Sequence, residues 1–214
     1  MIIPKAEATV ARLMDAAEAL VLEQGFAASS VDAIVARAGL TKGAFFHHFR
    51  TKSELAHALV ERYAAADERN LEETMERAER LTRDPLQQLL IFVGLLEEYW
   101  SQLTEPYPGC LFASYVSAAP LFAEETHALI RRAMSRWRER VGRKLREVAA
   151  RYEPRLPVDA DDVADELTVL FEGAFILAKA LDDRALVARQ LALYRGYLEL
   201  LFGAESGTND HQVD

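Results

Sequence analysis

The chain has 214 residues, a formal net charge of −9 and 50% apolar residues. This length and composition allow one large domain or two small ones, each with a real hydrophobic core. No run of about 18 apolar residues is present, which argues against a membrane-spanning helix and a membrane partner. A single cysteine excludes an intrachain disulfide. Because the N-terminus also lacks a secretion signal, we expect a cytoplasmic protein.

Helical periodicity runs along most of the sequence, glycine and proline cluster at a few places, and alternating strand patterns are scarce. We therefore predict an all-α fold. The first helix is expected from about Glu7 to Gln24, where Gly25 ends it. The stretch 29–55 then predicts two short helices joined by a tight glycine turn, with a longer helix beginning at once.

The first of these short helices has apolar side chains at i, i+3, i+4 and i+7, on one helical face: Val31, Ile34, Val35 and Ala38. Ser29 or Ser30 can cap its start, since a hydroxyl there accepts an otherwise unpaired N–H. Gly39 ends it. Thr41 then caps a second short helix. Two short helices joined in this way form a helix-turn-helix, whose second helix enters the major groove of DNA.

The second short helix, Lys42 to Phe49, exposes an unusual set of side chains on its outer face. Phe45 and Phe49 fall on the inner side, whereas Gly43, Ala44, Phe46 and His47 face outwards with His48 beside them. Small residues followed by an aromatic ring and a histidine favour close approach to DNA. The alternative is that a glycine in a first helical turn costs little and means little.

Charge supports a nucleic-acid partner only locally. Residues 1–52 carry a net charge of +1 and the remainder carries −10. From Arg37 to Lys52 there are four basic residues, two histidines and no acid. Binding to phosphates requires such a patch on the docking surface, not a basic protein overall. The acidic remainder would repel DNA and so limits how the protein can dock.

Residues 13–55 resemble the N-terminal domain of the TetR family of transcriptional regulators. The resemblance is carried by Ala16-Ala17, Gly25-Phe26, Ser29-Ser30-Val31, Ile34, Ala38-Gly39, Lys42-Gly43, His48-Phe49, Lys52 and Glu54. It implies a homodimer that binds a palindromic operator in double-stranded DNA and usually represses.

By position, the resemblance implies phosphate contacts from Ser30, Thr41, Lys42, His48 and Lys52, and base contacts from Gly43, Ala44 and His47. Phe46 departs from the family pattern, which usually has a tyrosine at this position whose hydroxyl reaches a phosphate. The phenyl ring could instead pack against a sugar or a thymine methyl group. The implied organisation is a DNA-binding domain over 1–52, a helical effector-binding and dimerisation domain over 53–203, and a disordered tail over 204–214.

The long helix that begins at the capping box Thr51–Glu54 should continue to about Leu81. Asp84-Pro85 opens the next helix, which a Pro- and Gly-containing turn at 105–109 breaks. A short helix is expected over Cys110–Ala119, and after the break at Pro120 a long one should continue to about Tyr152. Two final helices are expected over about Asp161–Leu181 and Arg184–Phe202.

These final two helices have apolar residues in steps of four and three, a pattern typical of a helix-packing seam. The family resemblance implies that this seam forms a four-helix dimer interface, with burial inside the same chain as the alternative. The predicted interface residues are Leu167, Leu170, Ala174, Leu177, Val187, Leu191, Tyr194 and Leu198.

Aromatic residues are frequent between the helix-turn-helix and these final helices. In a ligand-responsive regulator they would line an apolar cavity for a small-molecule effector. For any single residue, ordinary core packing is the alternative. The candidate cavity residues are Phe92, Tyr99, Trp100, Phe112, Tyr115, Met134, Trp137, Phe171 and Phe175.

Cys110 permits two interpretations. At the start of a helix the dipole can lower the pKa of a thiol, which would suit an electrophile- or redox-sensing regulator. Beside Leu111 and Phe112, it can equally be a small buried apolar residue.

The five histidines are scattered, and no metal-ligand spacing, nucleophile elbow or phosphate loop occurs. We therefore expect no enzyme activity, no metal and no cofactor. The favoured function is a dimeric repressor released from its operator by a small, largely apolar effector. The alternatives are a small-molecule-binding protein with a degenerate helix-turn-helix, which Phe46 keeps open, and a Cys110-based sensor.

Overall fold

The computed structural model describes residues 5–118 and 121–203, and every regular element longer than one turn in these ranges is an α-helix. The all-α prediction is therefore confirmed. The tail predicted at 204–214 lies outside the described residues. In chain order the helices are α1 (Lys5–Gln24), α2 (Val31–Ala38), α3 (Lys42–His48), α4 (Lys52–Leu81), α5 (Pro85–Ser101), α6 (Leu111–Val116), α7 (Glu124–Ala149), α8 (Ala160–Leu181) and α9 (Leu186–Phe202).

The helix-turn-helix forms where the capping residues predicted it. Ser30 Oγ accepts a hydrogen bond from the Ala33 N–H at 3.1 Å, and Thr41 Oγ1 accepts from the Ala44 N–H at 3.2 Å. Each hydroxyl satisfies a donor that has no partner within the helix. Gly39 adopts a left-handed conformation, with φ of +62°, and ends α2.

A compact core holds α1, α2, α3 and the start of α4 together, and we call this part the helix-turn-helix unit. Its fully buried side chains include Leu13, Ile34, Phe45 and Leu59. The same core also takes in side chains from α6 and α7, chiefly Leu111, Phe112, Tyr115, Ile130 and Ala133. The helix-turn-helix unit therefore packs directly against α6 and α7 and is not joined to the rest of the molecule by α4 alone.

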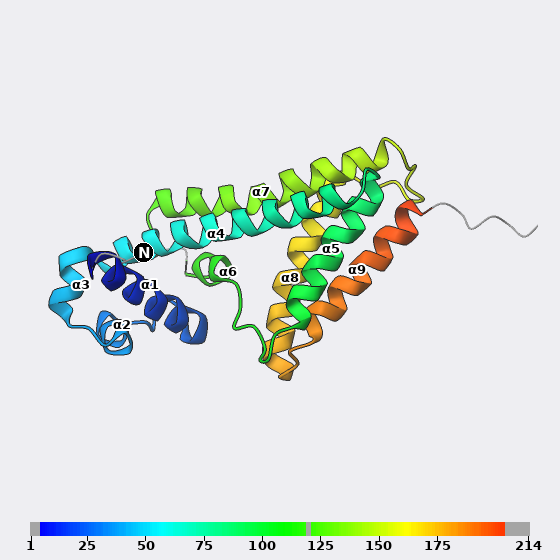
Figure 1. The fold of residues 1–214 in the computed structure, drawn as a ribbon. Coiled ribbons are helices and arrows are strands. Elements are labelled where there is room, and N and C mark those ends of the chain that lie inside the picture. Colours follow the sequence, from blue (N-terminus) through cyan, green and yellow to red (C-terminus); the bar gives the residue numbers. More distant parts are fainter. Residues whose placement is uncertain (1–4, 119–120, 204–214) are drawn as a thin grey trace, which may run out of the picture.

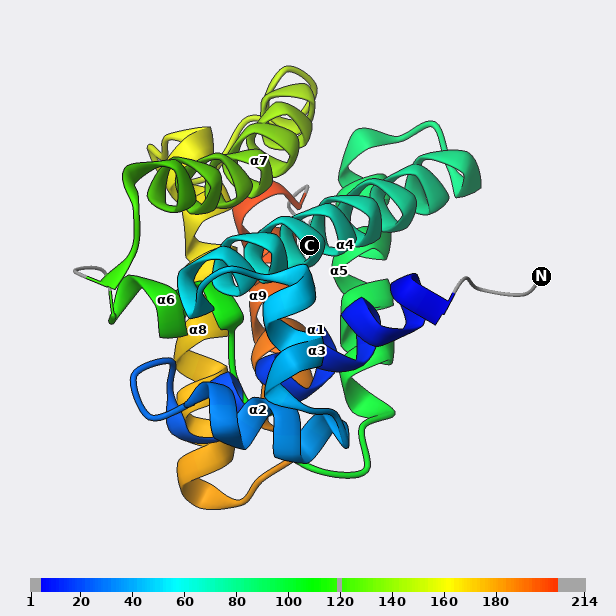
Figure 2. The ribbon, with the colours of Figure 1, turned by 90° about the vertical axis from the view of Figure 1, so that its left-hand side faces the viewer.

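The second core lies in the C-terminal body, which consists of the far half of α4 with α5, α7, α8 and α9. In Figure 1 the helix-turn-helix unit lies at one end and the body at the other, with α4 and α7 running side by side between them. Figure 2 looks onto the end with α1, α2 and α3, behind which α8 and α9 pass. Helix α4 is thus one uninterrupted helix that belongs to both cores.

Buried ion pairs lock α7 to the far half of α4. Arg140 Nε lies 2.9 Å from Glu72, and Arg140 Nη2 lies 3.0 Å from Glu79. Lys144 Nζ lies 2.9 Å from the same Glu79 carboxylate. The two basic side chains are buried and share the Glu79 carboxylate, while Glu72 gives Arg140 a second acidic partner and Glu147 gives Lys144 one.

Candidate nucleic-acid interface and ligand cavity

Helix α3 presents to solvent the face that the sequence predicted. Gly43, Phe46 and His47 are exposed, Ala44 and His48 are half-buried, and Phe45 is fully buried beneath them. The Phe46 ring is 54% exposed although it packs edge-on against Phe45, with 5.2 Å between ring centroids. Much of the Phe46 ring therefore remains open to solvent and is available for contact.

The fold does not require glycine at position 43. A Cβ added to Gly43 would meet only Thr41 Oγ1, at an ordinary contact distance of 3.7 Å. Alanine would favour the helix by roughly 1 kcal/mol. Because nothing inside the chain explains the glycine, close approach of an outside surface is the better explanation.

Lys42, at the first position of α3, is held in a weak ion pair. Its Nζ lies 2.7 Å from Asp32 Oδ1, and both side chains are more than half exposed. Exposed pairs of this kind contribute at most about 1 kcal/mol, so a phosphate could replace the carboxylate at little cost. The unpaired N–H groups at the start of the helix favour the same kind of anion.

Lys52 does not point where the sequence predicted. Its amine donates a hydrogen bond to the Phe26 carbonyl and lies 3.9 Å above the centroid of the Phe26 ring. Burial in this position lowers the pKa of Lys52. The Lys52 ammonium therefore does not point outwards to where a DNA phosphate would lie, because the Phe26 carbonyl and the face of the Phe26 ring hold it inwards.

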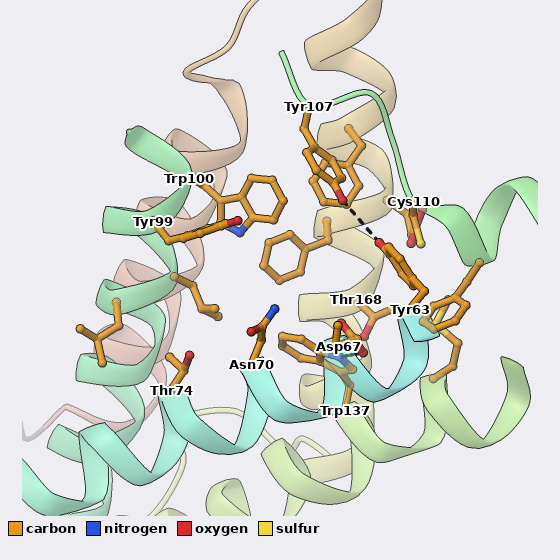
Figure 3. Close-up of a pocket in the computed structure, with 18 of the residues that line it drawn as sticks. Tyr63, Asp67, Asn70, Thr74, Tyr99, Trp100, Tyr107, Cys110, Trp137 and Thr168 are labelled. Carbon is orange, nitrogen blue, oxygen red and sulfur yellow. Dashed lines mark hydrogen bonds between the residues drawn. The ribbon is translucent and has the colours of Figure 1, made fainter. Parts of the chain in front are cut away.

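A cavity of about 510 Å³ lies in the body between α4, α5, α7 and α8, next to the segment that leads into α6. Figure 3 shows Tyr63, Asp67, Asn70 and Thr74 entering it from α4, and Trp100 from α5. Seven of the nine predicted aromatic and apolar side chains line it: Tyr99, Trp100, Phe112, Met134, Trp137, Phe171 and Phe175.

Phe92 and Tyr115 were wrongly assigned to the cavity. Phe92 is fully buried in the core of the body, beneath Trp137. Tyr115 is fully buried in the core of the helix-turn-helix unit, where its ring lies 5.5 Å from Phe26 and 4.5 Å from Phe122. Both rings serve packing, the alternative that the sequence had left open.

The polar side of the cavity was missed by sequence analysis. Tyr63, Asp67, Asn70 and Thr74 recur in steps of four, three and four, so they form one polar stripe on α4. That spacing was visible in the sequence, but a polar stripe on a long helix ordinarily faces solvent. Tyr107, Thr168 and Glu172 complete the polar wall, and no local pattern marks them.

Burial governs the chemistry of this wall. Asp67 accepts a hydrogen bond from Trp137 Nε1 at 2.8 Å, yet burial raises the pKa of its carboxyl to about 6. Burial likewise raises the pKa values of the Glu172 carboxyl and of the Tyr63 hydroxyl. The hydroxyls of Tyr63 and Tyr107 approach each other at 3.5 Å (Figure 3).

Cys110 does not have the environment of a reactive thiol. Burial raises its pKa to about 12, and the neighbouring Glu172 carboxyl raises it further than the start of α6 lowers it. The sensing interpretation required a lowered pKa, but the loss of water on burial outweighs the dipole of a six-residue helix. Cys110 is half-buried and lines the cavity, so the alternative of a small, largely enclosed side chain describes it better.

The predicted dimer seam faces the wrong way. Six of its residues are buried in the chain's own core: Leu167, Ala174, Val187, Leu191, Tyr194 and Leu198. Leu170 is half-buried, and only Leu177 is exposed. The exposed apolar side chains of α8 and α9 include Val169, Ile176, Leu193 and Leu200, each between 62% and 69% exposed, and the predicted Leu177 at 50%.

Comparison with known proteins covers both parts of the chain. The model for bacterial regulatory proteins of the tetR family matches residues 13–59, and that for a tetracyclin repressor-like C-terminal domain matches residues 85–194. The chain is 27% identical to the transcriptional regulator AcuR of Cereibacter sphaeroides over 157 residues, which are 73% of this chain and 70% of AcuR. It is 33% identical to the transcriptional repressor NemR of Escherichia coli over 99 residues, 46% of this chain and 48% of NemR.

Among solved structures, a TetR-family transcriptional regulator from Agrobacterium tumefaciens superposes with a TM-score of 0.72. The match covers 92% of this chain and all of that one at 24% identity, so it supports the fold alone. Across residues 5–118 and 121–203, no helix combines the length and apolar character that crossing a membrane requires.

Proposed function

This chain belongs to the TetR family of DNA-binding transcriptional regulators. We propose that it is a dimeric repressor that leaves its palindromic operator when a small ligand enters the cavity. Like the other members of its family, it is a DNA-binding regulator and not an enzyme. The observation that carries the proposal is the continuity of α4. The same helix begins at Lys52 in the helix-turn-helix unit and lines the cavity from Tyr63 to Arg77.

The DNA-reading surface is the exposed face of α3. Thr41 and Lys42 at its N-terminus, with Ser30 at the start of α2 and His48 beside the outer face, are the proposed phosphate contacts. Gly43, Ala44 and His47 lie where base edges would be read. The exposed Phe46 ring takes the place of a hydroxyl donor and packs against a sugar or a thymine methyl group.

A second copy of the chain is the proposed occupant of the exposed stripe on α8 and α9. The two helices pack side by side, so their exposed leucine, isoleucine and valine side chains form one apolar face. Gly173 and Gly196 lie on the same face and have no other part of the chain within 4 Å of an added Cβ, which lets a partner helix approach closely. A twofold dimer would bury this face against its own copy and present two α3 helices to DNA.

Phe112 joins the cavity to the helix-turn-helix unit. The Phe112 ring, which lines the cavity, stands edge-on to Tyr63 with 4.9 Å between centroids. Its neighbours Leu111 and Tyr115 are buried in the core of the unit. A ligand that displaces Tyr63 or Phe112 would thus move α4 and α6 together and alter the separation of the two α3 helices. By linkage, the operator must weaken ligand binding to the same degree.

The test is selection of binding sites from random duplex DNA by the purified, ligand-free protein. We expect enrichment of a palindrome by the wild type and its loss in the double variant Lys42→Ala, His47→Ala. Arg132→Ala, which removes one exposed charge on α7, is the matched control and should retain the palindrome. Circular dichroism verifies that each variant is folded.

Lack of enrichment at low salt would contradict the proposal once one trivial cause is removed. The protein is unfolded, freed of any copurified ligand, refolded and tested again. If the refolded dimer still selects no sequence, the helix-turn-helix unit does not read DNA.

A further inference from the structure

The apolar side of the cavity is a continuous wall of aromatic rings. Trp100 lies at its centre, with ring centroids 4.9 Å from Tyr107, 5.8 Å from Phe171 and 5.1 Å from Phe175. Tyr107 and Phe175 also touch, at 4.9 Å. The faces of such rings carry partial negative charge and attract a cation within about 6 Å.

The cavity is also lined by two carboxyl groups, Asp67 and Glu172, that have no basic partner among the described residues. One Asp67 oxygen accepts a hydrogen bond from Trp137 Nε1. The Glu172 carboxyl contacts the Cys110 thiol. Within the described ranges, neither forms an ion pair with a lysine or arginine. Removing carboxylates from water without a counter-charge is unfavourable, and the described part of the chain supplies no counter-charge to either group.

The basic side chain that lines the cavity does not cancel this charge. Arg77 is exposed at the far end of the α4 stripe, 10 residues and therefore about 15 Å along the helix from Asp67. Glu73 lies one turn before it and is also exposed. These two opposite charges offset each other at the outer end, whereas Asp67 and Glu172 lie at the inner, less exposed end.

From this arrangement we infer that the effector is an aromatic organic cation, whose positive charge lies between Asp67 and Glu172 and whose rings stack on the wall around Trp100. The inference rests on the proposed function, since it names the ligand class of the same cavity. An aromatic cation supplies the missing counter-charge and fills the apolar part at once. A neutral aromatic ligand would do only the second.

Two ions of matched size and shape test the charge preference directly: tetraphenylphosphonium and tetraphenylborate. Both tryptophans of the chain, Trp100 and Trp137, line the cavity, so quenching of intrinsic fluorescence reports binding there. The titrations are made in about 0.3 M NaCl to screen the overall charge of −9. The double variant Asp67→Asn, Glu172→Gln removes both charges. Glu98→Gln, exposed on α5 outside the cavity, is the matched control.

We expect the cation to bind at least about tenfold more tightly than the anion. The double variant should lose about tenfold or more of the cation affinity, and Glu98→Gln should stay within about twofold of wild type. Equal binding of the two ions, tighter binding of the anion, no quenching by either, or an unaffected double variant would each overturn the inference. Operator selection is made without ligand, so failure here leaves the DNA-binding proposal standing.

Discussion

The residue that best shows how the cavity is built is Asp67. It lies in the middle of α4, is largely enclosed, and has the Trp137 indole N–H as its hydrogen-bond donor. Burial holds the pKa of its carboxyl at about 6. Because the pKa is raised in the folded state, folding binds protons between about pH 4 and pH 6. The stability associated with Asp67 is present below this window and is lost as the pH rises through it.

Asp67→Asn should therefore stabilise the ligand-free protein at pH 7.5. The amide keeps an oxygen for the Trp137 N–H and carries no charge to desolvate, so we expect a gain of about 1–3 kcal/mol. The gain should fall to about half at pH 5 and approach zero only below about pH 4. Urea unfolding at pH 5 and pH 7.5 measures it, with Glu98→Gln as an exposed control. A variant that is less stable at pH 7.5, or equally shifted at both pH values, would contradict this account of Asp67.

Cys110 provides a second test at the residue scale. With its pKa raised to about 12, the thiol is almost wholly protonated at pH 7.5. We expect the native protein to react with iodoacetamide at least about a hundredfold more slowly than the urea-unfolded chain. Mass spectrometry of quenched samples gives both rates. A fast reaction in the native state would restore the thiol-sensing hypothesis.

At the scale of elements, local sequence patterns predicted the helix-turn-helix and failed elsewhere for identifiable reasons. The caps Ser30, Thr41 and Thr51 each act on a backbone N–H three residues ahead, so sequence order alone defines them. The position of α6 inside the first core depends on contacts with residues far away in sequence, such as that between Tyr115 and Phe26. No local pattern contains that information.

The apolar spacing of α8 and α9 could not predict which face of these helices is exposed. Spacing of four and three correctly marked an apolar stripe on α8 and α9, but it marked the stripe that packs inside the chain, for example Leu167 and Leu198. The exposed stripe, with Ile176 and Leu193, has the same period and the same residue types. Only the placement of α5 and α7 against the inner stripe determines which face remains open.

Ile176→Asp should convert the proposed dimer into a monomer. A charge at the centre of a self-complementary apolar face is buried twice in the dimer, once from each copy, and would have no partner. We expect a shift to the monomer mass in light scattering at micromolar concentration. Leu81→Asp, a leucine equally exposed at the end of α4, should leave the mass unchanged. If Ile176→Asp stays dimeric, the interface lies elsewhere.

At the scale of the whole molecule, charge and shape together restrict how DNA can be bound. Residues 53–214 carry a net charge of −10, so the body would be repelled by the phosphates that the helix-turn-helix unit contacts. Docking is then confined to the end that bears α3 (Figure 2). In a dimer, a ligand can then change the distance between the two α3 helices. It does so through α4 and through α6, whose side chains pack in the core of the helix-turn-helix unit.

The central claim is that two copies of α3 read two half-sites at a fixed separation. Fluorescence anisotropy with the selected operator, and with the same operator lengthened by five base pairs at its centre, tests it most directly. Five base pairs rotate one half-site by about half a turn, so the account predicts a loss of at least about a hundredfold in affinity, to the level of unrelated DNA. Unchanged affinity for the lengthened operator would contradict a rigid dimer and show that each copy binds DNA on its own.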